Sequence, residues 1–340
     1  MMRHNIKAEL TESMDSLHFS ARDKERMIRQ LSARQAQPKA QFSVRRAVWI
    51  AAAAVMLVGM LTGAAAFTRW SQTAQTKYNP SQEVKEQAEQ SGLSVMLNDN
   101  SGEVLSVEDQ DITITAVQTL VDEYGADITF RIEGFDIPEG RYPSVWPEIT
   151  IDGTTNFYTY QGGDFLMDGE VFEYTHHITF QENAGKYFGK EIVVQFDSLD
   201  IQSEVPAGFP ETAVDGNWEL RWTFTGTEEA IHITPNMEIG DSGVTLLEAE
   251  IGQMTLRTVY QLESYWAGWE TLKTFQPRLC AVRIQDGTEI TCYASTEGYQ
   301  DMDNLIFFVE SSMDGILDLS QVESLIFHTD SGEAVYIPIA

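Results

Sequence analysis

The sequence predicts a mainly β protein: two antiparallel, Ig-like β-sandwich domains, preceded by short N-terminal cytoplasmic helices and one transmembrane helix. Three observations predict this class. An uncharged apolar run at 47–68 separates a basic N-terminal segment from an acidic remainder. From about residue 95 the apolar pattern has a period of two, with Gly, Asp, Asn and Pro in the breaks. Several of these segments recur about 131 to 134 residues later, which indicates two copies of one unit.

The charge of the chain is divided unevenly along its length. The 340 residues carry a formal net charge of −30. Residues 1–46 contain ten Lys or Arg and five Asp or Glu, a net charge of +5, so residues 47–340 carry −35. A surface this acidic repels phosphate backbones, which excludes nucleic acid as a partner of the larger part.

The apolar run from Ala47 to Thr68 is long enough to cross a membrane. Its 22 uncharged residues would span roughly 33 Å as a helix, against a hydrocarbon core of about 30 Å. The basic flank predicts a single-pass cell-membrane protein with a cytoplasmic N-terminus and extracytoplasmic C-terminal domains. A cleaved signal peptide is the alternative, because Ala64–Ala66 resembles a cleavage site. Gly59 and Gly63 would allow two such helices to pack as a homodimer.

The cytoplasmic segment 1–46 has the pattern of two short amphipathic helices, which Pro38 closes. Helices this small bury too little surface to be stable alone, so we expect them to dock on a protein groove or on the anionic lipid bilayer. A loosely ordered tail that only sets topology is the plain alternative. The segment lacks Cys, so no zinc site is expected. The predicted partner-binding residues are Ile6, Leu10, Met14, Leu17, Met27, Ile28 and Leu31.

Residues 69–94 are polar and predict a linker, with a helical turn or two between Ser81 and Gln90. The two sandwiches follow at 95–227 and 228–340. Three pairs of similar segments support the repeat: 111–120 with 242–251, 149–154 with 283–288, and 191–196 with 324–329. Chance similarity among strands of restricted composition is the alternative explanation.

The two cysteines of the chain lie on either side of a predicted hairpin turn at 285–287. With Gly287 in the left-handed position of a three-residue loop, Val282 would face Ile290 and Cys280 would face Cys292. Opposed strand residues lie within disulfide range, and an extracytoplasmic location permits oxidation. A disulfide is therefore possible, but two buried thiols would give the same sequence pattern.

No motif for catalysis is found, so we expect neither an enzyme nor a bound cofactor or metal. The sequence has no HExxH and no GxSxG. The neighbours His176 and His177 point to opposite faces of a strand, so at most one of them could join a site. A hydrolase would require a pocket that gathers His177 or His232 with paired carboxylates.

The layout resembles membrane-anchored anti-sigma-factor-like proteins of Gram-positive bacteria, which carry an ectodomain of unknown function. The similar segments are 16–31, the RRAVWIAAAAVMLVGM anchor, the first outer strands from 106, and 236–264. The resemblance implies that the cytoplasmic segment holds an extracytoplasmic-function sigma factor and that the outer domains sense the envelope. Such systems are commonly released by a protease near the membrane.

The leading hypothesis is thus a single-pass regulator of transcription that binds a sigma factor. The alternative, from another class, is an envelope adhesion or ligand-binding module that the anchor merely tethers.

Overall fold

The computed structural model describes residues 70–97, 105–155, 158–168, 171–180, 182–203, 211–263, 278–329 and 332–339. These residues are mainly β, as predicted, with two α-helices among them. Within these ranges no helix is long and apolar enough to span a membrane. The predicted cytoplasmic segment 1–46, the apolar run 47–68 with Gly59 and Gly63, and the partner-binding residues all lie outside the described part.

The first half of the β structure, here called repeat 1, has two antiparallel sheets. One sheet has the order β1-β3-β4-β8-β7, with β2 also paired to β3. In the other sheet β9 pairs with β10, β5 and β6. A short 3-10 helix, η1 (Ala184–Tyr187), precedes β9. The strands are β1 (Ser94–Met96), β2 (Ser106–Asp109), β3 (Ile112–Val121), β4 (Gly125–Glu133), β5 (Arg141–Ser144), β6 (Glu148–Ile151), β7 (Tyr158–Asp168), β8 (Val171–Thr179), β9 (Glu191–Ser203) and β10 (Glu211–Thr223).

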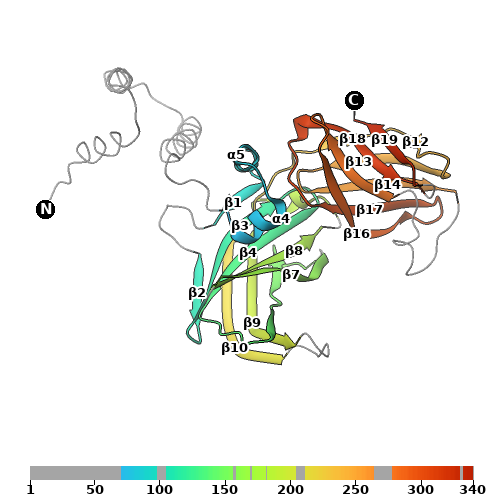
Figure 1. The fold of residues 1–340 in the computed structure, drawn as a ribbon. Helices are drawn as coiled ribbons and strands as arrows, with labels where there is room; N and C mark the ends of the chain where they lie inside the picture. Colours follow the sequence, from blue (N-terminus) through green and yellow to red (C-terminus); the bar gives the residue numbers. More distant parts are fainter. Residues whose placement is uncertain are drawn as a thin grey trace, which may run out of the picture. The chain divides into compact units, whose positions relative to one another are not determined.

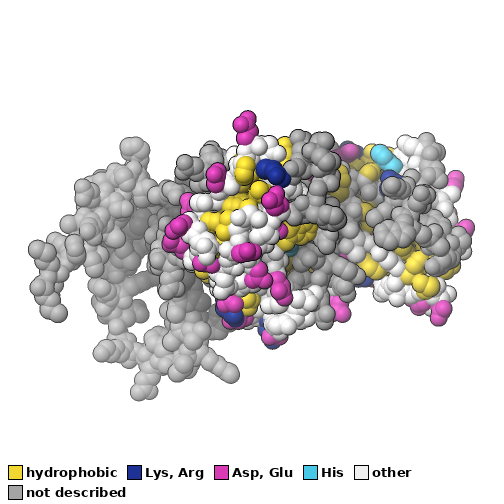
Figure 2. All heavy atoms as spheres, turned by 90° about the horizontal axis from the view of Figure 1, so that it is seen from below, with side chains coloured by type: hydrophobic (Ala, Val, Ile, Leu, Met, Phe, Trp, Pro, Cys, Tyr) yellow, Lys and Arg dark blue, Asp and Glu magenta, His cyan; other side chains and the backbone are white. Residues whose placement is uncertain are grey.

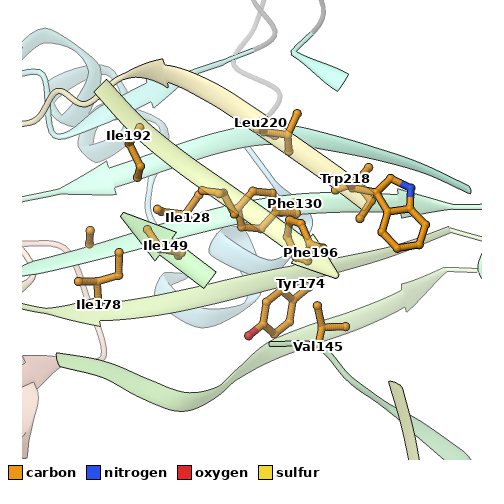
Figure 3. Packing of buried hydrophobic residues seen from close by; sticks show 14 of the residues in the cluster. Ile128, Phe130, Val145, Ile149, Tyr174, Ile178, Ile192, Phe196, Trp218 and Leu220 are labelled. Carbon is orange, nitrogen blue, oxygen red and sulfur yellow. The ribbon is translucent and has the colours of Figure 1, made fainter. Parts of the chain in front are cut away.

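The core of repeat 1 lies between its two sheets (Figure 3). Phe130 of β4 and Phe196 of β9 meet edge to face with their ring centroids 5.1 Å apart. Trp218 of β10 is fully buried, and its indole N–H donates to the carbonyl of Ile112 at 3.0 Å. The inward side chains alternate along β4, as the period of two predicts for a strand with one face on a core.

The second half, repeat 2, forms one continuous set of antiparallel pairings in the order β11-β13-β14-β17-β16-β15-β18-β19, with β12 paired to β13. The long strand β16 pairs with β17 along most of its length and with β15 at its start, so it belongs to both layers around the second core. η2 (Leu319–Gln321) precedes β18. The strands are β11 (Ile231–Ile233), β12 (Met237–Glu238), β13 (Val244–Ile251), β14 (Thr255–Leu262), β15 (Arg278–Ile284), β16 (Glu289–Asp301), β17 (Ile306–Met313), β18 (Val322–His328) and β19 (Ala334–Pro338).

The two repeats share most of their strand pairings. The order β3-β4-β8-β7 in repeat 1 corresponds to β13-β14-β17-β16 in repeat 2, and β6-β9-β10 corresponds to β15-β18-β19. All three pairs of similar sequence segments lie on equivalent strands. Both repeats even have a register shift at the same place, after Ala116 in β3 and after Leu246 in β13.

Residues 70–93 are more ordered than the linker that their polar composition predicts. They form α4 (Gln72–Tyr78), capped by Ser71, and α5 (Gln82–Gln90), capped by Ser81 (Figure 1). The helix predicted near 81–90 is thus confirmed, but the description of 69–94 as a linker is wrong. Only a few apolar residues of this segment are buried, against Leu120, Met254 and Ile316 of the β structure: Trp70, Ala74, Tyr78, Ala88 and Leu93.

Figure 2 shows many carboxylate side chains and few Lys or Arg side chains on the visible face of the described part. This agrees with the strong acidic excess of residues 47–340. The face seen in Figure 2 is therefore acidic, as the sequence predicts for the C-terminal part.

Candidate functional site

A cavity of about 260 Å³ lies where the two repeats and α4 meet. Repeat 1 contributes the turn between β3 and β4 together with parts of β4 and β8, and repeat 2 contributes the equivalent turn and parts of β16 and β17. The side chains that could interact with a bound molecule are mainly hydroxyls, with two basic and two acidic groups. The lining residues with polar side chains are Lys77, Tyr78, Tyr124, Asp127, His177, Thr179, Thr255, Tyr293, Ser295, Glu310, Ser311 and Ser312.

On the repeat 1 side, Asp127 is the centre of a polar cluster. Asp127 of β4 and His177 of β8 are cross-strand partners on the outer face of the sheet, and His177 Nδ1 lies 2.6 Å from Asp127 Oδ1. Helix α4 covers the pair and supplies two donors: the Tyr78 hydroxyl at 2.6 Å and Lys77 Nζ at 2.9 Å, both to Asp127 Oδ2. His177 Nε2 also lies 3.2 Å from Asp164.

The cluster keeps buried groups charged. Burial opposes the charge of Asp127, but His177, Lys77 and the hydrogen bonds from His177 and Tyr78 hold the pKa of Asp127 well below its usual range. Burial likewise opposes the charge of His177, but the charge and hydrogen bond of Asp127 raise the pKa of His177 to about 9. Burial and the nearby Asp127 raise the pKa of Tyr78 well above its usual value. At neutral pH the cluster thus holds a protonated imidazole beside an ionised carboxylate.

The next feature of the site is Asp122, which joins the two repeats. Its fully buried carboxylate accepts hydrogen bonds from the backbone N–H groups of Met254 and Thr255 in repeat 2, both at 2.8 Å, and from the Thr255 hydroxyl at 2.7 Å. It also accepts from Tyr124 and Gly125 in its own turn. Burial raises the pKa of Asp122, and these hydrogen bonds oppose the rise. One side chain therefore fixes two loops of different repeats to each other.

The position in repeat 2 that corresponds to Asp122 is Gly252. Both residues begin the turn after an equivalent strand, and both donate their N–H to the residue three positions later. A Cβ atom on Gly252 would lie 2.6 Å from Asp122 Oδ2. A side chain here would collide with the carboxylate, so the glycine makes room for the contact between the repeats.

Repeat 2 has a charged pair at the position of Asp127 and His177, with the order of charges reversed. Arg257 of β14 and Glu310 of β17 are cross-strand partners, and Arg257 Nε lies 3.8 Å from Glu310 Oε1. The guanidinium stacks over the rings of Tyr124 and Phe308. Glu310 is 1% exposed, and within the described part neither of its carboxylate oxygens has a hydrogen-bond partner. Burial raises the pKa of Glu310 to about 7, although Arg257 opposes this.

The geometry of His177 does not suit general-base catalysis. Both of its ring nitrogens face carboxylates, Asp127 and Asp164, and its raised pKa keeps it protonated at neutral pH. His232 approaches Glu250 at 3.4 Å and Glu123 at 3.9 Å, but it lies outside the lining of the cavity. Each of the two histidines thus lies beside two carboxylates. Such an arrangement can bind another group or hold two segments of the chain together.

The two histidines that follow each other in β8 point to opposite faces, as predicted. The ring of His176 is buried, with Nδ1 2.9 Å from the Tyr174 hydroxyl. Burial lowers the pKa of His176 to about 4. Among the described residues there is no group of three or more His, Cys, Asp or Glu placed to hold a metal ion.

Both predicted disulfide residues are free thiols in the structure. Val282 pairs with Ile290, as the hairpin predicts, but the register shifts at Cys280, between its neighbours in β15. Cys280 Sγ lies 3.0 Å from the carbonyl of Ile326, and Cys292 pairs with Met313 of β17. Burial raises the pKa of both thiols. Because β16 pairs with β17 from Cys292 onward, the two thiols do not face each other across a strand pair.

Sequence reasoning missed most residues of this site. Lys77 and Tyr78 lie in the segment interpreted as a linker, and Asp122, Asp127 and Glu310 carry no motif. The repeat gave no signal for the charged pairs either, because the similar segments 111–120 and 242–251 align at an offset of 131, which places Asp127 opposite Thr258 and not Arg257.

Comparison with known proteins gives little. No family model matches the sequence, and no curated protein matches it. One solved structure that is similar is the crystal structure of the conserved domain protein from Bacillus anthracis. The identity is 10%, over 73% of this chain and 89% of that chain, and the TM-score is 0.47. Nothing about function follows from a likeness of this size.

Proposed function

We propose that the chain is a single-pass membrane regulator of the anti-sigma-factor type, with a sensing ectodomain made of the two repeats. The observation that carries the proposal is the packing of α4 and α5. These helices begin a few residues after the apolar run 47–68, and they are built into the core that contains Leu120 of repeat 1 and Met254 and Ile316 of repeat 2.

This packing gives a physical route from the ectodomain to the membrane. Gln87 of α5 donates to Asp318 at 2.9 Å, and Ser91, directly after α5, donates to Gln253 at 2.9 Å, both in repeat 2. Lys77 and Tyr78 of α4 hold Asp127 in repeat 1. A change in how the repeats meet would therefore alter the segment that continues into the anchor. A loose linker would not transmit such a change.

The basic segment 1–46 supports the cytoplasmic half of the proposal. Its apolar stripe has no partner in a segment too small to fold alone, and a sigma factor is the partner that the family resemblance implies. The acidic C-terminal part keeps away from nucleic acid, so regulation would act through the protein partner.

The test is co-purification of the full-length chain with the sigma factors of its host, together with a transcription reporter. The double variant Leu10→Asp with Leu31→Asp is expected to lose the sigma factor and to release transcription. The double variant Thr11→Asp with Gln30→Asp adds the same charge beside the stripe and should behave as wild type. Recovery of no sigma factor, or equal binding by both double variants, would refute the proposal.

A tethered ligand-binding module is the second candidate, favoured by the cavity between the repeats. It predicts that deletion of residues 1–40 leaves transcription unchanged while binding to an envelope component is kept.

A further inference from the structure

Repeat 2 carries a row of four ionisable side chains across the outer face of its sheet. His232 of β11 is the cross-strand partner of Glu250 in β13, and Glu250 is the partner of Arg257 in β14. Arg257 is in turn the partner of Glu310 in β17. Residues opposed in this way share one face of a sheet. Two glutamates therefore flank one arginine, and the row runs from the exposed His232 to the buried Glu310.

The turn between β3 and β4 of repeat 1 lies on this row. Glu123 Oε1 lies 3.9 Å from His232 Nε2, and the hydroxyl of Tyr124 donates to Glu250. The guanidinium of Arg257 lies over the Tyr124 ring, 5.8 Å from its centroid. The charges of the row are thus part of the contact between the two repeats, so a change in one of them acts on that contact.

Glu310 is the buried end of the row. Its side chain is 1% exposed, and its carboxylate has no hydrogen bond to a described residue. Burial of an ionised carboxylate without hydrogen bonds is unfavourable, so burial raises the pKa of Glu310 to about 7 although Arg257 opposes this. Burial also raises the pKa values of Asp122 and Glu123. Both of these accept hydrogen bonds that support their charge, Asp122 from repeat 2 and Glu123 from Asn183.

Few other charges act on Glu310. On the β16 side its cross-strand partner is the uncharged Thr296, and Glu297, the next residue of β16, belongs to the opposite face of the sheet. Among the described residues, Arg257 is the charged group that opposes the effect of burial on Glu310. The charged groups across the cavity bind one another: Lys77, Asp127 and His177.

We propose that the contact between the two repeats depends on pH, so that protonation of Glu310 in a more acidic medium strengthens the contact and ionisation of Glu310 weakens it. Opening of the contact would hydrate Glu310, and the ionised form gains more from water than the neutral form. The ionised carboxylate therefore favours the open state, and the neutral acid favours the closed state.

This inference rests on the proposed sensing ectodomain and names its signal as the pH of the surrounding medium. The helices next to the apolar run are bonded to both repeats, because Lys77 of α4 holds Asp127 and Ser91 after α5 donates to Gln253. A change in the contact between the repeats would therefore reach the segment beside the membrane.

The test is hydrogen exchange of the full-length chain in lipid nanodiscs, measured by mass spectrometry at pH 6 and pH 8 and corrected for intrinsic rates. Protection of the turns 122–125 and 252–255 is expected to be about tenfold higher at pH 6. This factor follows from a pKa of about 7 in the closed contact against 4.5 in water. Glu310→Gln should abolish the difference, because an amide does not ionise.

Two matched variants serve as controls. Glu333→Gln makes the same change at an exposed glutamate outside the row and should keep the full difference. His232→Gln changes the exposed end of the row and should keep most of it. Loss of the difference in His232→Gln together with its persistence in Glu310→Gln would assign the pH dependence to the histidine and overturn the proposal.

A second measurement covers the case in which Glu310→Gln fails to fold. Infrared difference spectra of the wild-type chain, in which the lipid bands cancel, should show the carbonyl stretch of a protonated carboxylic acid that disappears with a midpoint near pH 7. The proposal fails if no carboxylic acid titrates between pH 6 and pH 8, or if the turns are equally protected at both pH values. Neither readout involves a sigma factor, so this failure is distinguishable from failure of the proposed regulatory role.

Discussion

The outer faces of repeat 1 and repeat 2 carry a charged cross-strand pair at the same position, but the two pairs differ in their surroundings. In repeat 1, Asp127 and His177 are 2.6 Å apart, and α4 adds Lys77 and Tyr78 as further donors to the aspartate. In repeat 2, Arg257 Nε and Glu310 Oε1 are 3.8 Å apart, and the carboxylate of Glu310 has no hydrogen bond to a described residue.

The difference teaches that the covering element decides the role of such a pair. The same cross-strand position can hold a satisfied ion cluster that fastens a helix, or a buried ion pair whose carboxylate has no hydrogen-bond donor. A buried ion pair contributes to stability only where further hydrogen bonds satisfy its remaining atoms. The first pair therefore fastens a helix to the sheet, whereas the second keeps a buried carboxylate without hydrogen-bond donors.

The largest effect is expected at Asp122, whose equivalent in repeat 2 is Gly252. Asp122→Ala should lower the free energy of unfolding by about 3 to 5 kcal/mol, because it leaves the buried N–H groups of Met254 and Thr255 without an acceptor. Urea unfolding of the full chain in detergent micelles, followed by tryptophan fluorescence, measures the loss. Asp303→Ala, in an exposed turn of repeat 2, is the control and should cost under about 0.5 kcal/mol.

The comparison of the two pairs is tested directly by changing each buried acid to its amide. Asp127→Asn should cost about 3 kcal/mol, because His177 and Lys77 lose a buried counter-charge. Glu310→Gln should change stability by only about 1 kcal/mol, because no hydrogen bond is lost and the ion pair that it removes is long, with 3.8 Å between Arg257 Nε and Glu310 Oε1. Equal costs in the same urea experiment would contradict the distinction between a hydrogen-bonded pair and an unsatisfied one.

The pH dependence of stability should reflect His177. Its pKa is raised to about 9 in the folded chain, against about 6.5 when unfolded, so its contribution is full below pH 6.5 and is lost as the pH rises through 9. Between pH 7 and 9 the free energy of unfolding should fall by about 2 kcal/mol. His177→Gln should flatten this slope, whereas His328→Gln, an exposed control on β18, should keep it.

The smallest effect concerns the single hydroxyl that α4 gives to Asp127. Tyr78→Phe removes a donor at 2.6 Å and should cost about 1 kcal/mol. Hydrogen exchange measured by mass spectrometry should show faster exchange in α4, about fivefold for this energy, with the strands unchanged. Tyr293→Phe, on the exposed rim of the cavity, serves as the control. Unchanged protection of α4 would show that Lys77 and His177 alone hold the helix in place.

The sequence predicted the β class and the repeat because both depend on local patterns. Alternation in β4 and the Gly287 turn after β15 are properties of a few consecutive residues. The equivalence of β6 with β15 followed from short similar segments. These features can be recognised in the sequence because each depends only on one strand and its neighbouring turn.

The site was beyond prediction for a different reason. Asp127 gains its role from Tyr78, 49 residues earlier, and Asp122 from Thr255, 133 residues later. α4 has few apolar residues, so its burial depends on partners that its own sequence does not reveal. The choice between a disulfide and two thiols stayed open for a similar reason, because the register beside Cys280 also depends on β18.

The register shift that β3 and β13 share also concerns the history of the chain. Two unrelated sandwiches would have little reason to place an irregularity after the same strand position, Ala116 in one and Leu246 in the other. The match indicates an ancestral gene segment of about 130 residues that was duplicated in tandem. Duplication frees one copy to change while the other keeps the original task.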